Sequence, residues 1–411
     1  MTPTTFAADQ TGASDVRAIS LVGAAHFVSH IYIFALPILF PFLRAEFGVS
    51  YTTLGGVIAI FNVLTGVLQT PAGFLVDRTS ARAVLIGGLL LGAVSLAFAA
   101  ALPSFAVFVA ATALLGLANT VYHPADYSLL SSRISAQRMS QAYSIHIFAG
   151  FVGTAVTPAL TIALAQSFGW RGALLFLAAI GFAVAAALVL FGDVLGGADG
   201  HHAPSAEGKR NGSDWRLLLS AAILLNLVFF MLLSMANSGI AGYGIVALEA
   251  LWNVPLSFAT SALTAYLTAS AAAVLVGGFI SARTGRHDLV AMIGLSLSAI
   301  TLIPVALWDV GSTMVIVLMG LSGFFIGVIM PSRDMLVRAV APAGSFGKIF
   351  GFVTTGFNIG AIIAPPAFGF MMDHGAPAAV LIGTALCGLA AVPTLVVSTL
   401  WARRRKSASA R

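Results

Sequence analysis

Long apolar runs alternate with short polar turns along the whole 411-residue chain. About twenty apolar residues are needed to cross the hydrocarbon core of a bilayer, and each run is about that long or longer. The runs therefore predict spanning helices at 18–43, 51–76, 83–102, 104–131, 139–166, 171–192, 216–248, 256–281, 288–308, 312–340, 346–372 and 377–401. This pattern predicts an all-α membrane protein with twelve transmembrane helices, six in each half.

Sequence landmarks recur in the same order in the two halves. A turn with Gly73 and Arg82 is followed by a related turn with Gly278 and Arg283, at an offset of 205 residues (278 − 73). Three further pairs recur at an offset of 207 residues, namely Pro124 and Pro331, Gly153 and Gly360, and Pro158 and Pro365. The chain therefore reads as two parallel six-helix repeats, an arrangement typical of transporters whose binding site lies between the halves.

The polar segments set the predicted boundaries. An N-terminal tail at 1–17 precedes a six-helix bundle at 18–192. A linker at 193–215 leads to the second six-helix bundle at 216–401, and a basic tail follows at 402–411. The adjacent pair His201 and His202 in the linker is expected to be solvated, because flexible polar linkers hold no fixed ligand geometry.

Composition supports a membrane location. Hydrophobic residues make up 59% and charged residues 8% of the chain, and the mean hydropathy is +0.99. About a quarter of the residues in a soluble domain are charged. The net charge of +6 comes from basic residues spread through short turns, which indicates membrane orientation and not nucleic-acid binding.

The basic residues also predict the orientation. If the N-terminus is cytoplasmic, only Arg44 and Arg171 fall on the outer side, whereas the other basic turns and the 403–406 cluster fall inside. We therefore expect a multi-pass protein of the bacterial inner membrane with both termini in the cytoplasm. The single Cys387 allows no internal disulfide. The protein is expected to be a monomer.

Enzymatic and nucleotide-driven functions are disfavoured. The chain has no Gly-x-x-x-x-Gly-Lys-Ser/Thr loop, so direct ATP use is not expected, and neither is another cofactor. His26 and His30 have the spacing of a zinc-protease motif, but Phe27 stands where the general base is required. No enzyme activity and no metal site are therefore predicted. A receptor or scaffold without transport activity would have no need for charges inside the helices.

A turn motif carries a resemblance to a known family. Gly73, Asp77, Arg78 and Arg82 follow the pattern Gly-x-x-x-Asp-Arg-x-x-x-Arg after the second helix, and Gly278 and Arg283 belong to a degenerate copy. With this motif and twelve predicted helices, the chain resembles members of the major facilitator superfamily. The resemblance implies alternating access between two halves. It also implies that these six residues form a conformational latch.

Shorter stretches are similar to fosmidomycin-resistance-like exporters. They are Ala25-His26-Phe27, Leu68-Gln69, Val121-Tyr122-His123-Pro124 and Gly169-Trp170-Arg171. Helix 5 also carries Gly150, Gly153, Thr157 and Pro158, which are similar to the glycine-proline motif of antiporters in the superfamily. The resemblance implies proton-coupled export of a drug-like or anionic compound. Proton-coupled uptake of a small organic acid is the alternative.

Polar residues inside the predicted helices are the candidate substrate and proton pathway. A charge at the centre of a spanning helix costs roughly 2.5–3.5 kcal/mol or more, so it is expected to face a cavity or a partner. Protons acting through the carboxyl group or an imidazole are the expected driving ion. The candidates are His26, His30, Asn119, Tyr122, His123, Asp126, Arg333, Asp334 and Asn358.

The repeat offset links two of these charges. Adding 207 to Asp126 gives Arg333, so opposite charges occupy equivalent positions in helices 4 and 10. One hypothesis is that the two side chains pair across the pathway and close its cytoplasmic side. The alternative is that Asp126 pairs within its own half, with Arg133 or a histidine, while Arg333 neutralises Asp334.

Overall fold

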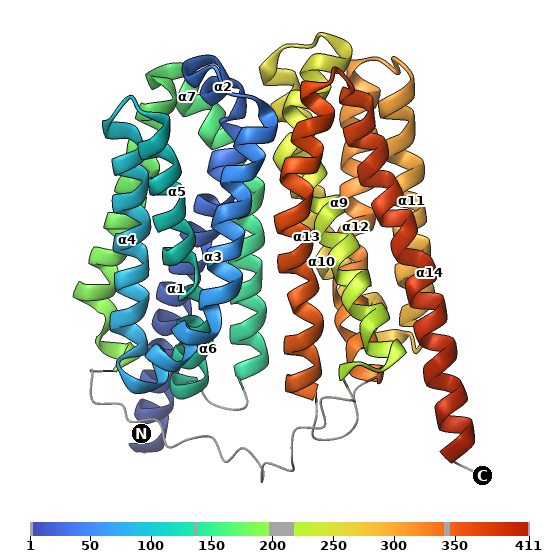
Figure 1. Cartoon of the computed structure of the whole chain (residues 1–411). Coiled ribbons are helices and arrows are strands. Elements are labelled where there is room, and N and C mark those ends of the chain that lie inside the picture. Colours follow the sequence, from blue (N-terminus) through green and yellow to red (C-terminus); the bar gives the residue numbers. More distant parts are fainter. Residues whose placement is uncertain (1–2, 135–137, 197–217, 341–345, 410–411) are drawn as a thin grey trace. The chain divides into compact units, whose positions relative to one another are not determined.

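The structure is a computed structural model that describes residues 3–134, 138–196, 218–340 and 346–409. Within these ranges the chain forms helices, turns and bends, with no β-strand (Figure 1). The helices are α1 Pro3–Ile38, α2 Phe40–Phe47, α3 Tyr51–Arg78, α4 Ala81–Ala101, α5 Phe105–Asn119, α6 Tyr122–Arg133, α7 Met139–Phe191, η1 Gly192–Leu195, α9 Ala221–Trp252, α10 Leu256–Arg283, α11 His287–Leu307, α12 Ser312–Val340, α13 Phe346–Asp373 and α14 Pro377–Ser409. The predicted all-α class is confirmed. Most of the linker, with His201 and His202, lies outside the described residues.

The number of apolar helices agrees with the predicted membrane crossings. Eleven helical segments of the described chain are long and apolar enough to span a bilayer. One of them, 141–195, has 55 residues, which is about twice the length that one crossing needs. The backbone leaves the helical region at Gly169, with φ 70° and ψ 164°, and this bend divides α7 between the two predicted spans. The arrangement as two repeats remains a prediction.

Proline explains a break in the fourth predicted span. α5 ends at Asn119 and α6 begins at Tyr122. Pro124 lacks the N–H that would bond to the Thr120 carbonyl one turn earlier, and its ring crowds that carbonyl. The run predicted as 104–131 therefore forms two helical pieces, and the shorter piece carries His123 and Asp126.

The two ends of the chain are more helical than the predicted tails implied. α1 begins at Pro3, inside the segment expected to be a polar tail, and α14 continues through the basic C-terminal residues to Ser409. The first predicted span, 18–43, is divided by a turn at Leu39 into α1 and α2. These ends are polar helical extensions of apolar spans.

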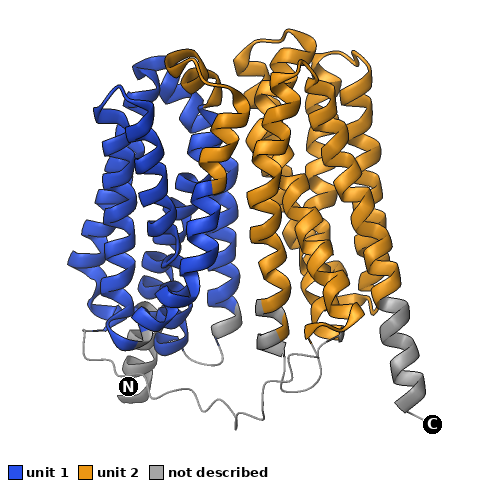
Figure 2. Cartoon of the chain, in the orientation of Figure 1, with its two compact units in different colours: residues 1–39, 60–208 blue, residues 40–59, 209–411 orange. Residues whose placement is uncertain are grey.

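The chain divides into two compact units (Figure 2). Unit 1 consists of residues 1–39 and 60–208. In it, α1 packs along α7, and α4 packs against both α5 and α7. Buried alanine and leucine side chains, such as Ala25, Leu89 and Leu174, fill these helix contacts.

Unit 2 consists of residues 40–59 and 209–411. α9 packs against α13 and α14, and α10 packs against α12. A core cluster on α9, α11, α12, α13 and α14 includes Phe229, Phe230 and Ile329. Unit 2 also contains α2 and the first turns of α3, although the sequence repeats group residues 40–59 with the first half.

Candidate functional site

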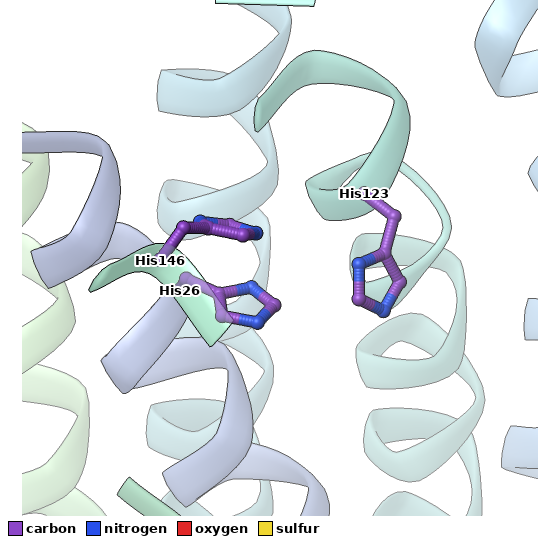
Figure 3. A group of neighbouring side chains, drawn as sticks. All are labelled: His26, His123 and His146. Carbon is purple, nitrogen blue, oxygen red and sulfur yellow. The ribbon is translucent and has the colours of Figure 1, made fainter. Parts of the chain in front are cut away.

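Three helices of unit 1 bring imidazoles and a carboxyl group together in the apolar interior. His26 and His30 are four residues apart on α1 and therefore lie on one helical face. His123 and Asp126 lie on α6, directly after the break that Pro124 causes, and His146 lies on α7. Figure 3 shows the rings of His26 and His146 beside each other and the ring of His123 facing them. We call these five residues the histidine-aspartate cluster.

Asp126 is the central charged group of the histidine-aspartate cluster. Its side chain is fully buried, and its Oδ2 lies 3.2 Å from His26 Nδ1 and 3.9 Å from His146 Nε2. Among the described residues, neither carboxyl oxygen has an aligned hydrogen-bond partner. A buried carboxylate without such partners is costly unless it carries a proton or faces a cation. The cluster is therefore suited to hold and release one positive charge.

The imidazoles of the cluster contact one another. The ring of His26 lies 3.8 Å from that of His146, 4.7 Å from that of His30 and 5.2 Å from that of His123, measured between centroids. His26 and His146 are buried, whereas His123 is exposed. The cluster thus extends from a buried carboxyl group to an exposed imidazole, and imidazoles take up and release protons near physiological pH.

A threonine orients His30. Thr154 Oγ1 donates to the Gly150 carbonyl at 3.1 Å and lies 2.9 Å from His30 Nδ1. When the hydroxyl hydrogen is directed to the carbonyl, the oxygen accepts from Nδ1–H of His30, and Nε2 of His30 is the nitrogen left to accept a proton. Thr154 was not among the predicted site residues, because a threonine in an apolar helix gives no signal of its partner.

Gly150 makes room for two of the rings. A Cβ atom at Gly150 would lie 2.8 Å from ring atoms of both His26 and His30. Contacts that short force the surrounding side chains out of position. The glycine that the sequence analysis assigned to an antiporter-like motif therefore also shapes the histidine-aspartate cluster.

Three of these imidazoles also have the spacing of metal ligands. His26, His123 and His146 each offer a ring nitrogen, and these atoms lie within 4.8 Å of one another. Tetrahedral zinc needs nitrogen ligands about 2.0 Å from the ion. The rings of His26 and His146 lie 3.8 Å apart between centroids, with 30° between their planes. The expected absence of a metal site stays a prediction.

Two other predicted pathway residues of unit 1 make polar contacts to neighbouring helices. Tyr122 is buried, and its hydroxyl donates to the Gly88 carbonyl on α4 at 3.2 Å. Asn119 Nδ2 lies 3.4 Å from Thr65 Oγ1 on α3. Both groups link neighbouring helices, and polar contacts of this kind contribute about 0.6 kcal/mol each inside membranes.

Unit 2 holds a second polar centre around Arg333 on α12. Its Nε donates to Asp334 Oδ1 at 2.9 Å, and its Nη1 lies 3.3 Å from Met330 Sδ. The guanidinium carbon lies 5.1 Å from the Phe230 ring centroid and 5.3 Å from that of Phe357. The charge is thus held between aromatic faces. Asn358, which follows Phe357 on α13, is half-buried.

These contacts correspond to the second of the two pairings considered from the sequence. Asp126 faces two histidines of unit 1, and Arg333 neutralises Asp334 within unit 2. The pair between Asp126 and Arg333, which would close the cytoplasmic side, stays a prediction.

The residues of the predicted latch differ in how they are placed. The Asp77 side chain lies outside the described part of the structure, Arg78 is exposed, and a Cβ at either Gly73 or Gly278 would meet open space. Arg82 donates to the carbonyls of Leu188 and Val189 at 2.8–3.1 Å. Arg283 lies over the ring of Phe279, with the guanidinium carbon 3.5 Å from the centroid.

The contacts of Arg82 have a clear physical role. The last carbonyls of a helix lack intrahelical partners and carry partial negative charge, and a guanidinium satisfies both needs. Arg82 therefore joins the start of α4 to the C-terminal end of α7. A role of the six motif residues as a latch remains a prediction.

Comparisons with known proteins agree on one family. The family model described as Major Facilitator Superfamily matches residues 22–251 and 227–411. The fosmidomycin resistance protein of Escherichia coli (strain K12) is 23% identical, over 87% of this chain and 86% of that protein. The probable sulfoacetate transporter SauU of Cupriavidus necator is 22% identical, over 91% and 92%. The crystal structure of a mutant of the nucleoside transporter NupG aligns with a TM-score of 0.76 at 14% identity, over 93% and 99%.

Proposed function

Because the chain belongs to the Major Facilitator Superfamily, and is thus a membrane transporter and not an enzyme, we propose that it exports an anionic or drug-like compound in exchange for protons. The proposed location is the bacterial inner membrane, with both termini cytoplasmic and a monomer as the working form. Transport proceeds by alternating access, in which a central site opens to one face of the membrane at a time.

The observation that carries this proposal is the histidine-aspartate cluster. A fully buried carboxyl group faces the imidazoles of His26 and His146, and the exposed His123 belongs to the same cluster. Ionisable groups at such depth in a membrane protein mark proton or ion pathways. Protonation of the cluster on the outer side and its release on the inner side would drive the opposite movement of substrate.

Arg333 supports an anionic substrate. Its Nε is occupied by Asp334, while its planar guanidinium presents further N–H donors that match carboxylate, sulfonate or phosphonate oxygens. Phe230 and Phe357 provide apolar contact beside that charge. The names of two similar proteins refer to fosmidomycin, a phosphonate, and to sulfoacetate, an organic anion.

A flux experiment in proteoliposomes tests the proposed function. Fosmidomycin and sulfoacetate are the two probes, each measured with an imposed pH gradient and with the gradient collapsed. Exchange for protons predicts accumulation of the probe in the acidic compartment. Transport that does not respond to the pH gradient for either probe would contradict proton coupling.

Uptake of a small organic acid together with protons is the second candidate. The similarity to a probable sulfoacetate transporter over most of both chains supports it. Cotransport with protons predicts accumulation in the alkaline compartment, so the same experiment separates the two directions of coupling.

Replacing Arg333 by glutamine is expected to raise the KM for the transported anion about tenfold to a hundredfold, because hydrogen bonds to a charged group contribute roughly 1.5–3 kcal/mol. Lysine at this position is expected to restore only part of the affinity, since an ammonium group lacks the planar fork. Concentration dependence of flux in proteoliposomes measures both. Arg338→Gln, an exposed arginine on the same helix, is the matched control. Equal KM values for the Arg333→Gln and Arg338→Gln variants would contradict the proposal that Arg333 binds the substrate.

A further inference from the structure

Asp373, the last residue of α13, caps the start of another helix within unit 2. Its Oδ1 accepts from the Tyr51 amide at 2.8 Å, and its Oδ2 accepts from the Thr52 amide at 2.7 Å and from Thr52 Oγ1 at 2.5 Å. Tyr51 and Thr52 form the first turn of α3. Amides of a first turn have no partner inside their own helix, and the helix dipole favours negative charge at this end. The carboxylate therefore supplies what this helix start lacks.

The surrounding contacts hold the two backbones close together. The Tyr243 hydroxyl donates to the Pro365 carbonyl of α13 at 2.6 Å and lies 3.3 Å from the Tyr51 carbonyl of α3. A Cβ at Gly369 would lie 2.4 Å from that same Tyr51 carbonyl, so only glycine allows this approach. The contact thus joins backbone carbonyls of α3 and α13 through the Tyr243 hydroxyl of α9, and Asp373 adds its carboxylate at the end of α13.

The position of α3 gives this contact its importance. The first residues of α3, up to Ala59, belong to unit 2, whereas the helix from Ile60 onward belongs to unit 1. Asp373 therefore holds the first turn of a helix whose remaining turns are part of the other unit (Figure 2). A movement that separates this end of α3 from α13 has to break the three hydrogen bonds.

We propose that Asp373 is a releasable cap, which holds the start of α3 on α13 in the conformation seen here and lets go when this end of the pathway opens. Asp373, Tyr51 and Thr52 lie at the helix ends expected on the outer side, so the cap would close the pathway to the outside. Asp373 is half-buried, and water can replace its partners when the helices part. The release step rests on the proposed alternating access.

Hydrogen exchange tests the cap without any substrate. In Asp373→Ala, the amides of Tyr51 and Thr52 are expected to exchange roughly tenfold faster or more, since hydrogen bonds to a charged group are among the stronger ones in proteins. Asp373→Asn keeps an acceptor oxygen but no charge, so its exchange rate at these amides is expected to lie between those of the wild-type protein and Asp373→Ala. Asp309→Ala is the matched control, because this exposed acid accepts locally from Gly311. Unchanged exchange in both Asp373 variants would overturn the cap.

A reversible crosslink tests the release. Thr52→Cys and Asp373→Cys are combined in a Cys387→Ala background, which removes the one native cysteine. Oxidation is expected to stop proton-driven flux of the transported probe, and reduction of the same sample is expected to restore it. Flux that continues with the disulfide formed would show that the contact never opens and would overturn the release. Faster amide exchange in Asp373→Ala would support the cap even if flux proves independent of the pH gradient. The cap and the proposed proton-coupled transport can therefore be contradicted separately.

Discussion

Asp126→Asn is expected to reduce transport driven by a pH gradient at least roughly a hundredfold, because the only carboxyl group in the histidine-aspartate cluster is removed. Asparagine has nearly the same shape and still fits the buried position, but it cannot take up or release a proton. The measurement is accumulation of the transported probe in proteoliposomes with an imposed gradient, at equal amounts of reconstituted protein.

Exchange of labelled for unlabelled probe distinguishes lost coupling from lost binding. This exchange moves no net protons, so Asp126→Asn is expected to retain it while losing gradient-driven accumulation. Asp288→Asn is the matched control, because Asp288 pairs with Arg286 at 3.3 Å close to the start of α11. Full gradient-driven accumulation by Asp126→Asn would contradict the proposed proton site. Loss of both activities in a folded variant would instead assign Asp126 to substrate binding.

The helices could be predicted from the sequence because the bilayer sets their length. The run at 256–281 is observed as α10, Leu256–Arg283, and the run at 312–340 is observed as α12, Ser312–Val340. Water-soluble turns and apolar spans differ so strongly in composition that these boundaries agree within a few residues. The turn at Leu39 was harder to predict, because residues 18–43 read as one apolar run and only the prolines Pro37 and Pro41 mark a break within it.

The candidate residues were easier to predict than their partners. His26, His30 and Asp126 stand out because polar groups inside apolar helices are costly. Which side chain Asp126 faces depends on the rotation of α6 after its break, and sequence spacing does not contain that rotation. The repeat offset pointed to Arg333, whereas in this structure the imidazole of His26 lies 3.2 Å from the carboxyl group.

Asp373 was missed for a related reason. An acidic residue at the end of an apolar run reads as a solvated turn, because sequence hydropathy describes one helix at a time. Its partners are amides more than 300 residues earlier in the chain, with separations of 321 and 322 residues. Backbone amides look the same at every position of a sequence, so no pattern of side chains marks them as partners.

Gly323→Ala is expected to lower the thermal midpoint of the purified protein by roughly 5 °C or more. α12 packs directly on α10, and a Cβ at Gly323 would lie 2.0 Å from the Tyr266 carbonyl oxygen. Backbone cannot move aside as a flexible side chain can, so the two helices would have to separate. Overpacking of this kind costs about 1–3 kcal/mol, and each kcal/mol shifts the midpoint by about 2–4 °C in domains of 150–250 residues.

Gly320 provides the matched comparison on the same helix. A Cβ at Gly320 would meet its nearest neighbours in Ala265 at 4.0 Å, which is an ordinary contact distance. Alanine in a helix interior is more favourable than glycine by roughly 0.5–1 kcal/mol, so Gly320→Ala is expected to keep or slightly raise the midpoint. The two substitutions add the same methyl group one helical turn apart, and opposite shifts would therefore locate the α10–α12 contact. Equal midpoints would mean that the helices lie farther apart around Gly323 than the structure places them.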